Sequence, residues 1–365
     1  MHSLSHYYVG RANNFNLLRV VSASSVIVSH AYALALGIET NDFLAPYLPG
    51  YNLGRLAVWT FFIISGFFVS QSFERKSSFS DFCFARFLRL YPGLLISLFI
   101  TAFLIGPLFT ELPLREYLES TTPALYVVKN LLLRTPMVTL PKVFTHNPFP
   151  GVVNGSLWSL YYEVICYFLV VYVGSLTAHR RLFFIVSITV YFFLYGCVSW
   201  INHAVNIAHH IHTIRTPYLY ETTLPFVMGM IFYRYRNYIP YHFIFALLAF
   251  AAMVWLRGNP YFIDIFVILW AYIVFYLGFF PSKWLLAYNK LGDYSYGIYI
   301  YSWPVMQMIT ASIPGISLGE TIALAFPASV ACGIVSWRLI EKPALSLRPK
   351  LAGYMQKVTQ LAING

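Results

Sequence analysis

Residues 15–37 read FNLLRVVSASSVIVSHAYALALG, a mostly apolar run that contains one arginine, Arg19, and one histidine, His30. A helix rises 1.5 Å per residue, so a run of this length crosses the hydrocarbon core of a bilayer, which is about 30 Å thick. The preceding residues are polar and lack the short apolar core of a cleaved signal peptide. We therefore expect this run to be the first membrane-spanning helix and an uncleaved anchor.

Runs of the same kind recur along the chain. Of its 365 residues, 59% are hydrophobic and 10% are charged, whereas soluble domains carry about 25% charged residues. This composition excludes a soluble domain with a single anchor, and it predicts an all-α integral membrane protein, a bundle of about ten transmembrane helices. The predicted spans lie near 15–37, 53–72, 90–110, 157–176, 182–200, 218–233, 241–257, 260–279, 294–313 and 317–338.

The distribution of charge orients this bundle. The formal net charge is +11, and most Lys and Arg residues lie in one alternate set of the connections between spans. Because positive charge concentrates on the cytoplasmic side of membrane proteins, both termini are predicted to be cytoplasmic, and no nucleic-acid partner is expected. The longest connection, 111–156, then lies outside. It has room for a surface helix around 114–134 and is a candidate lid or acceptor platform.

The chain is expected to form one domain. Residues 1–14 are a predicted cytoplasmic segment, 15–338 the helix bundle with its external loop near 111–156, and 339–365 a cytoplasmic tail too short for another catalytic domain. The sequence contains no internal repeat and no glycine-rich nucleotide-binding motif, which argues against an ATP-driven pump. No metal is predicted, because the cysteines are scattered and one group of external histidines has no zinc-site spacing. These histidines are His203, His209, His210 and His212.

Arg19 and His30 share one face of the first span. They are eleven residues apart, which at 100° per residue brings them within about 20° of each other and about 16 Å apart along the axis. A charged side chain at mid-membrane costs roughly 2.5–3.5 kcal/mol, so both residues are candidates for function. The alternative is that Arg19 extends to the inner interface and His30 hydrogen-bonds to a neighbouring carbonyl.

Glu163 and Arg55 also occupy positions where charge is costly. Glu163 follows SLWSLYY (156–162) and is predicted to lie about six residues into the fourth span, at a depth that overlaps that of His30. Its carboxylate can orient the imidazole. Alternatively, it pairs with Arg55 at the outer end of the second span to neutralise both charges. Both interpretations remain open, and both place Glu163 inside the bundle.

Two further motifs open predicted spans. In FARFLRLYP (84–92), Arg86 and Arg89 share a helical face and can bind phosphate oxygens, although any cytoplasmic boundary can carry such a pair. In LGDYSYGIYIYSWP (291–304), Asp293 is the predicted N-cap of the ninth span. The tyrosines of this motif belong either to an interfacial aromatic belt or to a polar vestibule.

Taken in order, these segments resemble the membrane-bound acyltransferase 3 family over nearly the whole chain. No single segment is distinctive, but the ordered set is fairly specific. The matching segments are NFNLLR (14–19) with His30, FFIISGF (61–67), the Arg86 and Arg89 pair, SLWSL (156–160) with Glu163, SYGIYIYSWP (295–304) and EKP (341–343).

The resemblance implies a multi-pass enzyme of the bacterial inner membrane that moves an acyl group, usually acetyl, from cytoplasmic acyl-CoA to a hydroxyl group. The implied acceptor is an extracytoplasmic glycan or a lipid-linked saccharide, and a periplasmic or glycan-assembly protein is a further candidate partner. The family's essential histidine corresponds to His30, as catalytic base or acyl carrier, and its arginines correspond to Arg19, Arg86 and Arg89, as ligands of CoA. Two features depart from many relatives: Ser302 stands where they have a second histidine, and no hydrolase-like domain follows the bundle.

Position in the bundle adds further candidates. Glu163 is the second predicted catalytic residue, because it can orient His30, and Arg55, Tyr161 and Tyr299 are predicted to contact the acceptor. Other functional classes also need polar groups inside a bundle. A transporter or flippase for lipid-linked saccharides is the main rival, although such proteins often contain a repeated half. A non-catalytic assembly partner is disfavoured, because buried charges are costly in a scaffold.

Overall fold

The structure is a computed structural model that describes residues 2–8, 12–37, 41–48, 51–75, 79–133, 136–176, 182–189, 192–193, 196, 216–257, 259 and 262–348. Throughout these residues the regular structure is helical, and extended pairing is limited to isolated bridges such as Ser3 with Pro240. The prediction of an all-α fold is therefore confirmed. Contacts divide the chain into two compact units, which are described separately below.

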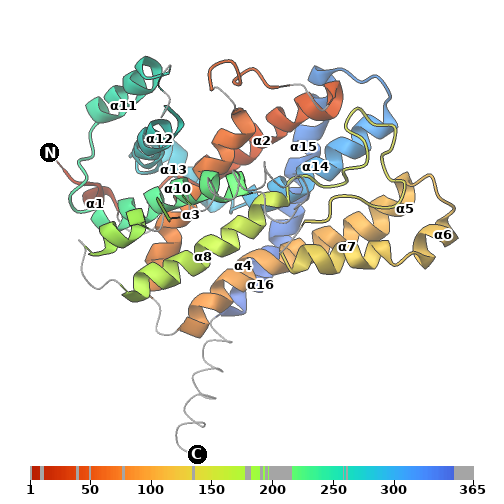
Figure 1. The fold of residues 1–365 in the computed structure, drawn as a ribbon, viewed down its shortest axis with the longest axis horizontal. Helices are drawn as coiled ribbons and strands as arrows, with labels where there is room; N and C mark the ends of the chain where they lie inside the picture. The colour runs from red at the N-terminus through yellow and green to blue at the C-terminus, as the bar shows by residue number, and fades with distance from the viewer. Residues whose placement is uncertain are drawn as a thin grey trace, which may run out of the picture. The chain divides into compact units, whose positions relative to one another are not determined.

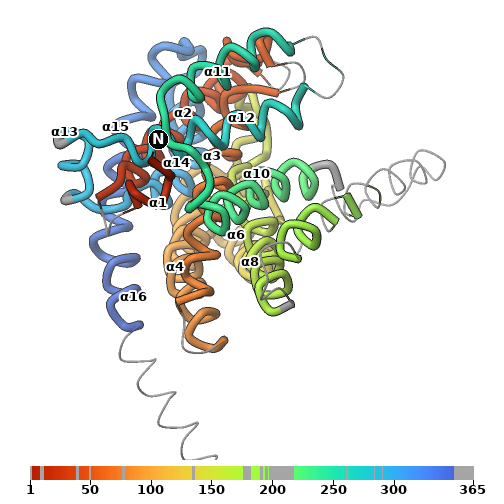
Figure 2. Tube along the Cα trace, turned by 90° about the vertical axis from the view of Figure 1, so that its left-hand side faces the viewer, coloured from red at the N-terminus to blue at the C-terminus, as the bar shows by residue number. Residues whose placement is uncertain are grey.

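The first unit comprises residues 1–30, 41–74 and 158–293. Its long helices come from the predicted spans, and α3, α8 and α10 lie side by side in it (Figures 1 and 2). The helices are α1 (Leu4–Tyr7), α2 (Phe15–Leu36, whose last turns group with the second unit), α3 (Leu53–Glu74), α8 (Trp158–Leu176), α10 (Thr216–Tyr235), α11 (Phe243–Trp255), α12 (Phe262–Gly278), α13 (Lys283–Ala287) and the 3-10 turn η2 (Tyr288–Lys290).

Two glycines bring α3 and α10 into backbone contact. A Cβ added to Gly66 would overlap the carbonyl oxygen of Phe226 and would lie 2.9 Å from its carbonyl carbon and 3.2 Å from Cα of Gly229. A Cβ added to Gly229 would lie 3.0 Å from Cα of Gly66. Small residues allow membrane helices to approach this closely. Gly66 of the FFIISGF motif therefore serves the packing of the helix that carries Arg55.

The second unit comprises residues 31–40, 75–157 and 294–365. In it α14 and α15 pack along each other, and α7 packs on α4 (Figure 1). The helices are α4 (Phe79–Ile100), the π-helical turn η1 (Thr101–Ile105), α5 (Gly106–Phe109), α6 (Leu114–Glu119), α7 (Thr122–Leu131), α14 (Ser295–Ser312), α15 (Leu318–Ser336), the π-helical turn η3 (Trp337–Glu341) and α16 (Lys342–Ser346).

A buried hydrogen bond from Tyr117 links α6 to the π-helical turn η1. Its hydroxyl donates a hydrogen bond of 2.8 Å to the carbonyl oxygen of Ala102. The ring is fully buried, and burial raises the pKa of the phenol to about 12, so the donor proton stays in place at neutral pH. Gly106 leaves room for this contact, because a Cβ there would overlap the tyrosine hydroxyl.

The long connection after α5 has two parts. Its first part contains α6 and α7, which lie where a surface helix around 114–134 was predicted. Its second part is hydrogen-bonded to α14: Asn147 Nδ2 donates to the carbonyl oxygen of Gln307 at 2.9 Å, and Gln307 Nε2 and Trp303 Nε1 donate to the carbonyl oxygen of Val152 at 2.7 and 2.9 Å. Buried amide networks of this kind rigidify a segment. The loop is therefore better suited to a fixed platform than to a mobile lid.

Five helical stretches are long and apolar enough to cross a membrane, counting only the described residues: Phe15–Leu36, Leu53–Glu74, Phe79–Phe109, Trp158–Ser175 and Leu318–Ser346. The predicted spans near 218–233 and 294–313 are occupied by α10 and α14, of 20 and 18 residues, and those near 241–257 and 260–279 by the shorter apolar helices α11 and α12. Most of 182–200 lies outside the described residues. The third span was predicted to begin near residue 90, but its helix α4 begins at Phe79. The segment with Arg86 and Arg89, which was predicted to precede the span, forms the first turns of this helix.

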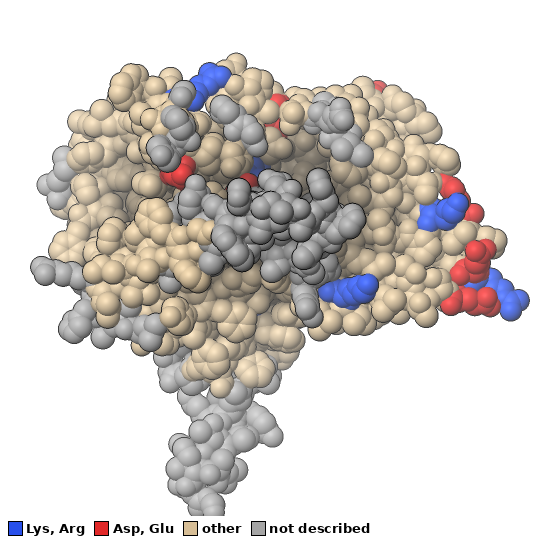
Figure 3. Space-filling model, in the orientation of Figure 1, with Lys and Arg blue, Asp and Glu red and all other residues tan. Residues whose placement is uncertain are grey.

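The surface of these helices suits a hydrocarbon environment. Large apolar side chains such as Phe99, Phe103 and Phe168 remain exposed on the long helices. Figure 3 shows a face with few charged side chains apart from a group at its edge, over α6. Arg115 and Glu119 of α6 are among the exposed charges. Lipid can cover the apolar faces, which in water would be an aggregation hazard.

Candidate functional site

His30 lies near the end of α2, beside a buried carboxylate that the sequence analysis did not single out. This carboxylate is Asp42, which is 3% exposed and has a Coulombic interaction with the half-buried His30. Asp42 is held by three donors: Ser29 Oγ at 2.5 Å, the Leu53 amide at 2.8 Å and the Leu44 amide at 3.0 Å. The connection between α2 and α3 thus supplies His30 with a fixed negative neighbour.

Sequence alone carried little signal for Asp42. The connection also contains Glu39, and neither acid belongs to a recognisable motif. The fold of the connection brings the Asp42 carboxylate to Ser29, the residue that precedes His30 in α2, and this contact identifies Asp42 as the neighbour of His30.

At the other end of α2, Arg19 is paired. Its Nη1 lies 3.5 Å from Oδ2 of Asp293 and 3.3 Å from Oδ1 of Asn16, and its guanidinium stands 5.4 Å from the centre of the Phe68 ring. The predicted N-cap role of Asp293 is wrong. Tyr294 is the N-cap of α14, and the Asp293 carboxylate instead balances the charge of an arginine in a helix with few polar neighbours.

Arg55, in the first turn of α3, lies against two adjacent aromatic rings. Its guanidinium carbon lies 4.7 Å from the centre of the Trp158 ring and 4.8 Å from that of Tyr218. Its Nη1 is 2.8 Å from Oε2 of Glu221 in α10. Arg55 therefore forms its ion pair with Glu221, and the predicted structural pairing of Arg55 with Glu163 is replaced by this contact.

Glu163 lies one turn into α8 and has other partners. The Tyr167 hydroxyl donates to its Oε1 at 2.5 Å, and Ser65 Oγ of α3 approaches the same oxygen at 3.5 Å. Both hydroxyl groups are directed at the same carboxylate oxygen. The structure thus brings Glu163 together with Ser65, the polar side chain of the FFIISGF motif.

In the second unit, Arg89 forms a compact cationic group with residues from α14 and η3. Its Nη1 lies 3.5 Å from Oε2 of Glu341, and its guanidinium carbon is 5.9 Å from the ring centre of Tyr296 and 6.0 Å from that of Trp337. Glu341 is only 1% exposed and also accepts a hydrogen bond of 2.9 Å from Ser336 Oγ. The EKP motif and the arginine pair, distant in sequence, therefore meet here. Arg86 stands one turn before Arg89 on α4.

The remaining predicted contact residues, Tyr299 and Tyr161, each contact another residue of the chain. The Tyr299 hydroxyl donates to the carbonyl oxygen of Ser156 at 2.8 Å, which fixes the start of the SLWSL motif on α14. Ser302, in the place of the second histidine of many relatives, hydrogen-bonds to the carbonyl oxygen of its own helix at Tyr299, at 3.1 Å. Tyr161 packs its ring 5.1 Å from that of Tyr162.

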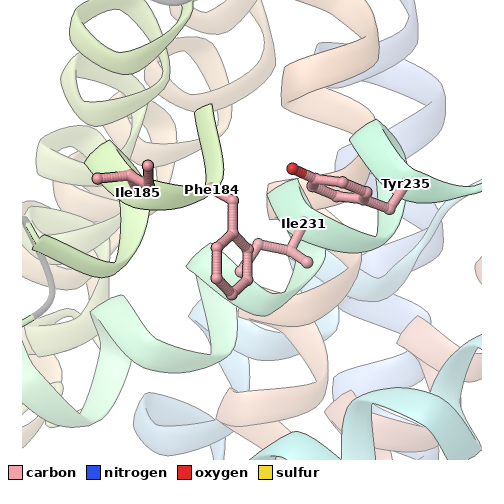
Figure 4. A pocket seen from close by; sticks show the side chains of 4 residues that line it. All are labelled: Phe184, Ile185, Ile231 and Tyr235. Carbon is pink, nitrogen blue, oxygen red and sulfur yellow. The ribbon is translucent and has the colours of Figure 1, made fainter. Parts of the chain in front are cut away.

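An open apolar groove of about 470 Å³ lies between α10 and the helical segment 182–189. Four side chains line it: Phe184, Ile185, Ile231 and Tyr235. Figure 4 shows Phe184 extending from its segment toward Ile231 of α10. These four side chains are apolar or aromatic, which suits hydrocarbon chains.

Possible metal ligands do not cluster in the part of the chain that the structure describes. No group of three or more His, Cys, Asp or Glu side chains there can hold a metal ion. The four external histidines between 203 and 212 lie outside the described residues.

Comparison with known proteins gives one family match and two relatives of nearly full length. A family model described as an acyltransferase domain matches residues 13–340. The chain is 27% identical to an O-acetyl transferase of Shigella phage Sf6 over 359 residues, which cover 94% of this chain and 99% of the relative. It is 28% identical to Nodulation protein 10 of Rhizobium leguminosarum bv. viciae over 369 residues, 94% of this chain and 95% of the relative. No solved structure matches the chain.

Proposed function

We propose, from the premise that this chain belongs to the acyltransferase 3 family of membrane proteins, that it moves an acetyl group from cytoplasmic acyl-CoA to a hydroxyl of an extracytoplasmic glycan. The observation that carries this proposal is the likeness over 99% of the length of a protein named O-acetyl transferase. The membrane-spanning helices support an enzyme that works within the bilayer.

Donor binding is assigned to the arginines. CoA carries phosphates, which arginines bind through charge-assisted hydrogen bonds. Arg86 and Arg89 lie on one face of α4, and the side chain of Arg89 is 24% exposed while Glu341 holds it from the buried side. That exposure leaves the guanidinium accessible to a phosphate. Arg19, which is 21% exposed, is the third candidate.

Acyl transfer is assigned to His30. Acting as general base, the imidazole removes the proton of the acceptor hydroxyl while the hydroxyl oxygen attacks the thioester carbonyl. The carbon–sulfur bond then breaks, and the imidazolium returns the proton to the CoA sulfur. Asp42 is suited to stabilise the transient imidazolium, because its carboxylate is fixed by three donors and interacts electrostatically with His30. Glu163 keeps its proposed place in the same site, and direct acylation of His30 is the alternative route.

The first test is release of free thiol from acetyl-CoA by the purified protein in nanodiscs. The acceptor is the surface glycan of the cells that naturally produce the protein, here called the host. Wild-type protein should release thiol only when the glycan is present, and His30→Ala should abolish the release while insertion and thermal unfolding stay normal. His242→Ala is the matched control, since that histidine only caps α11. Near-normal turnover by His30→Ala removes His30 from catalysis. Glycan transport by the protein in sealed vesicles, without thiol release, would identify a transporter.

The second test concerns the donor site. The double variant Arg86→Ala and Arg89→Ala should weaken acetyl-CoA binding about tenfold or more, with a smaller dependence on salt, because two charged contacts are lost. Arg348→Ala is the control, because it removes an arginine that pairs with Asp81 near the start of α4, the helix that carries Arg86 and Arg89. Unchanged CoA affinity in the double variant would restrict the pair to a role in topology.

The direction of transfer depends on topology. Reporter fusions within residues 111–156 should place this connection outside the cell. A cytoplasmic location would reverse the proposed path from CoA to the acceptor.

A further inference from the structure

We propose that five residues of the first unit, Tyr51, Arg55, Trp158, Tyr218 and Glu221, form the binding site for the sugar rings of the acceptor. We call this group the Arg55 cluster. The proposal rests on the proposed function and names the residues that select its acceptor.

The centre of the Arg55 cluster is a partly buried ion pair. The side chains of Arg55 and Glu221 are 20% and 13% exposed, so both are shielded from water yet can be reached by a ligand. Nη1 of Arg55 and Oε2 of Glu221 face each other at 2.8 Å. Among the described residues, neither atom has a partner that meets the distance and angle criteria for a hydrogen bond. Buried polar atoms that lack such bonds are costly. The two facing atoms are themselves buried, so the exposed area of both side chains lies on their other atoms. Hydroxyl groups of a ligand, which both donate and accept, can contact the ion pair from that exposed side.

Aromatic rings fix the orientation of the guanidinium. Trp158 and Tyr218 both lie within 5 Å of its central carbon, and their own ring centres are 4.8 Å apart. Cation–π contacts of this kind are strongest over tryptophan. Because the two ring centres are also close to each other, both rings lie on one side of the guanidinium. They hold the planar group in one orientation, so its N–H groups act as directional donors rather than as a diffuse charge.

A phenol completes the polar lining. Burial raises the pKa of Tyr51 to about 12, with a further contribution from the charge of Glu221, while Arg55 acts in the opposite direction. The hydroxyl therefore keeps its proton at neutral pH and can both donate and accept. At the side of the cluster, the Tyr220 hydroxyl is hydrogen-bonded to Asp264, a second carboxylate that interacts with Tyr51.

The charge balance of the Arg55 cluster distinguishes it from the proposed donor site. One guanidinium and one carboxylate leave it without net charge, whereas the group of Arg86, Arg89 and Glu341 carries a surplus positive charge. A polyphosphate favours the surplus charge. A neutral sugar offers hydroxyls to the ion pair and apolar C–H faces to aromatic rings, and Trp and Tyr are the side chains that combine apolar area with a polar end. The Arg55 cluster therefore suits a saccharide and not CoA.

Binding is tested without any acyl donor. The purified protein in nanodiscs is titrated with a panel of methyl glycosides, namely the glucoside, galactoside, rhamnoside and N-acetylglucosaminide, and also with the host's surface oligosaccharide, with tryptophan fluorescence as the readout. Wild-type protein should bind at least one of these sugars, and Glu221→Gln and Arg55→Lys should weaken that binding about tenfold or more. Trp158→Phe should remove most of the fluorescence change while sugar binding, followed by calorimetry, persists.

Controls separate this site from folding and from chemistry. Arg257→Ala removes another arginine that stacks on a tyrosine, 5.1 Å from the ring of Tyr47 and outside the Arg55 cluster, and it should bind sugar as the wild type does. Glu221→Gln should retain CoA affinity, and in turnover it should raise KM for the glycan and leave KM for acetyl-CoA unchanged. Its unfolding temperature should fall somewhat, because Arg55 loses its charged partner, and sugar binding is therefore compared at a temperature where both proteins are folded.

Three results would overturn the assignment: wild-type protein that binds none of the sugars, Glu221→Gln and Arg55→Lys that bind them as tightly as wild type, or a loss confined to CoA binding. Because sugar binding is measured without acetyl-CoA, its presence without thiol release would refute acyl transfer and leave the saccharide site standing. Thiol release that is insensitive to Glu221→Gln would leave acyl transfer standing and refute the saccharide site.

Discussion

Replacing Gly66 with alanine tests the packing that positions α3. The added methyl would lie 2.9 Å from the carbonyl carbon of Phe226 and 3.2 Å from Cα of Gly229, and still closer to the Phe226 oxygen. All these atoms belong to the backbone of α10, so no rotamer change can relieve the overlap. Ordinary van der Waals contact begins at 3.4 Å, and the helices must therefore separate by at least 0.5 Å, the difference between 3.4 and 2.9 Å.

The expected cost follows from that separation. Overpacking a tight core costs about 1–3 kcal/mol, and a gap of 0.5–1 Å forfeits roughly a quarter to a half of the dispersion energy of the atoms along it. Because α3 and α10 pack together more extensively than any other pair of described helices, we place Gly66→Ala near the upper limit, at about 3 kcal/mol. That corresponds to a roughly 100-fold smaller ratio of folded to unfolded protein.

Thermal unfolding in detergent, followed by a thiol-reactive dye, measures this loss, because Cys166 is fully buried until the unit opens. Gly319→Ala is the matched control. A Cβ there would meet no atom within 4 Å, and alanine has the higher helix propensity, so its stability should be equal or slightly higher. An unfolding temperature of Gly66→Ala equal to that of the control would show that α3 and α10 are not in backbone contact at this point.

Three further substitutions separate chemistry from architecture. Asp42→Asn should lower kcat about tenfold or more while KM for both substrates changes little, because the charge beside His30 is lost; steady-state kinetics would contradict this if KM alone rose, and the unfolding temperature is measured alongside because the new NH2 group faces the backbone N–H of Leu44 or Leu53. Glu341→Gln should destabilise the protein by about 1–2 kcal/mol, less than for a fully buried pair because the Arg89 side chain is 24% exposed, and unfolding curves at low and high salt would measure it. Tyr117→Phe should cost about 1–2 kcal/mol by leaving a buried carbonyl without its donor, with specific activity per folded molecule unchanged, and a selective loss of turnover would argue against a purely structural role.

Several features of this protein could be predicted from local sequence. The apolar runs specify helices, because a backbone in hydrocarbon must satisfy its own hydrogen bonds. The presence of Arg19, His30, Arg55 and Glu163 within or beside those runs identified costly side chains that need partners. Neither inference depends on which helices are neighbours.

The partners themselves could not be predicted. Asp293 was expected to cap a helix and instead pairs with Arg19. Glu221, which was not singled out, makes the contact with Arg55 that was one of the two interpretations of Glu163. Both acids lie far along the chain from their arginines. Spacing along one helix defines a face, but it carries no information about which distant helix packs against that face.

Sequence by itself therefore determined the class of fold, the family and the ionisable groups available for chemistry, since these follow from composition, periodicity and ordered motifs. Tertiary structure alone decided how charges are paired: Asp42 beside His30 through a folded connection, Glu221 beside Arg55 through the contact of α3 with α10, and Glu341 beside Arg89. The physical reason is that ion pairs in a low-dielectric interior depend on distances of a few ångströms, and those distances are set by helix packing.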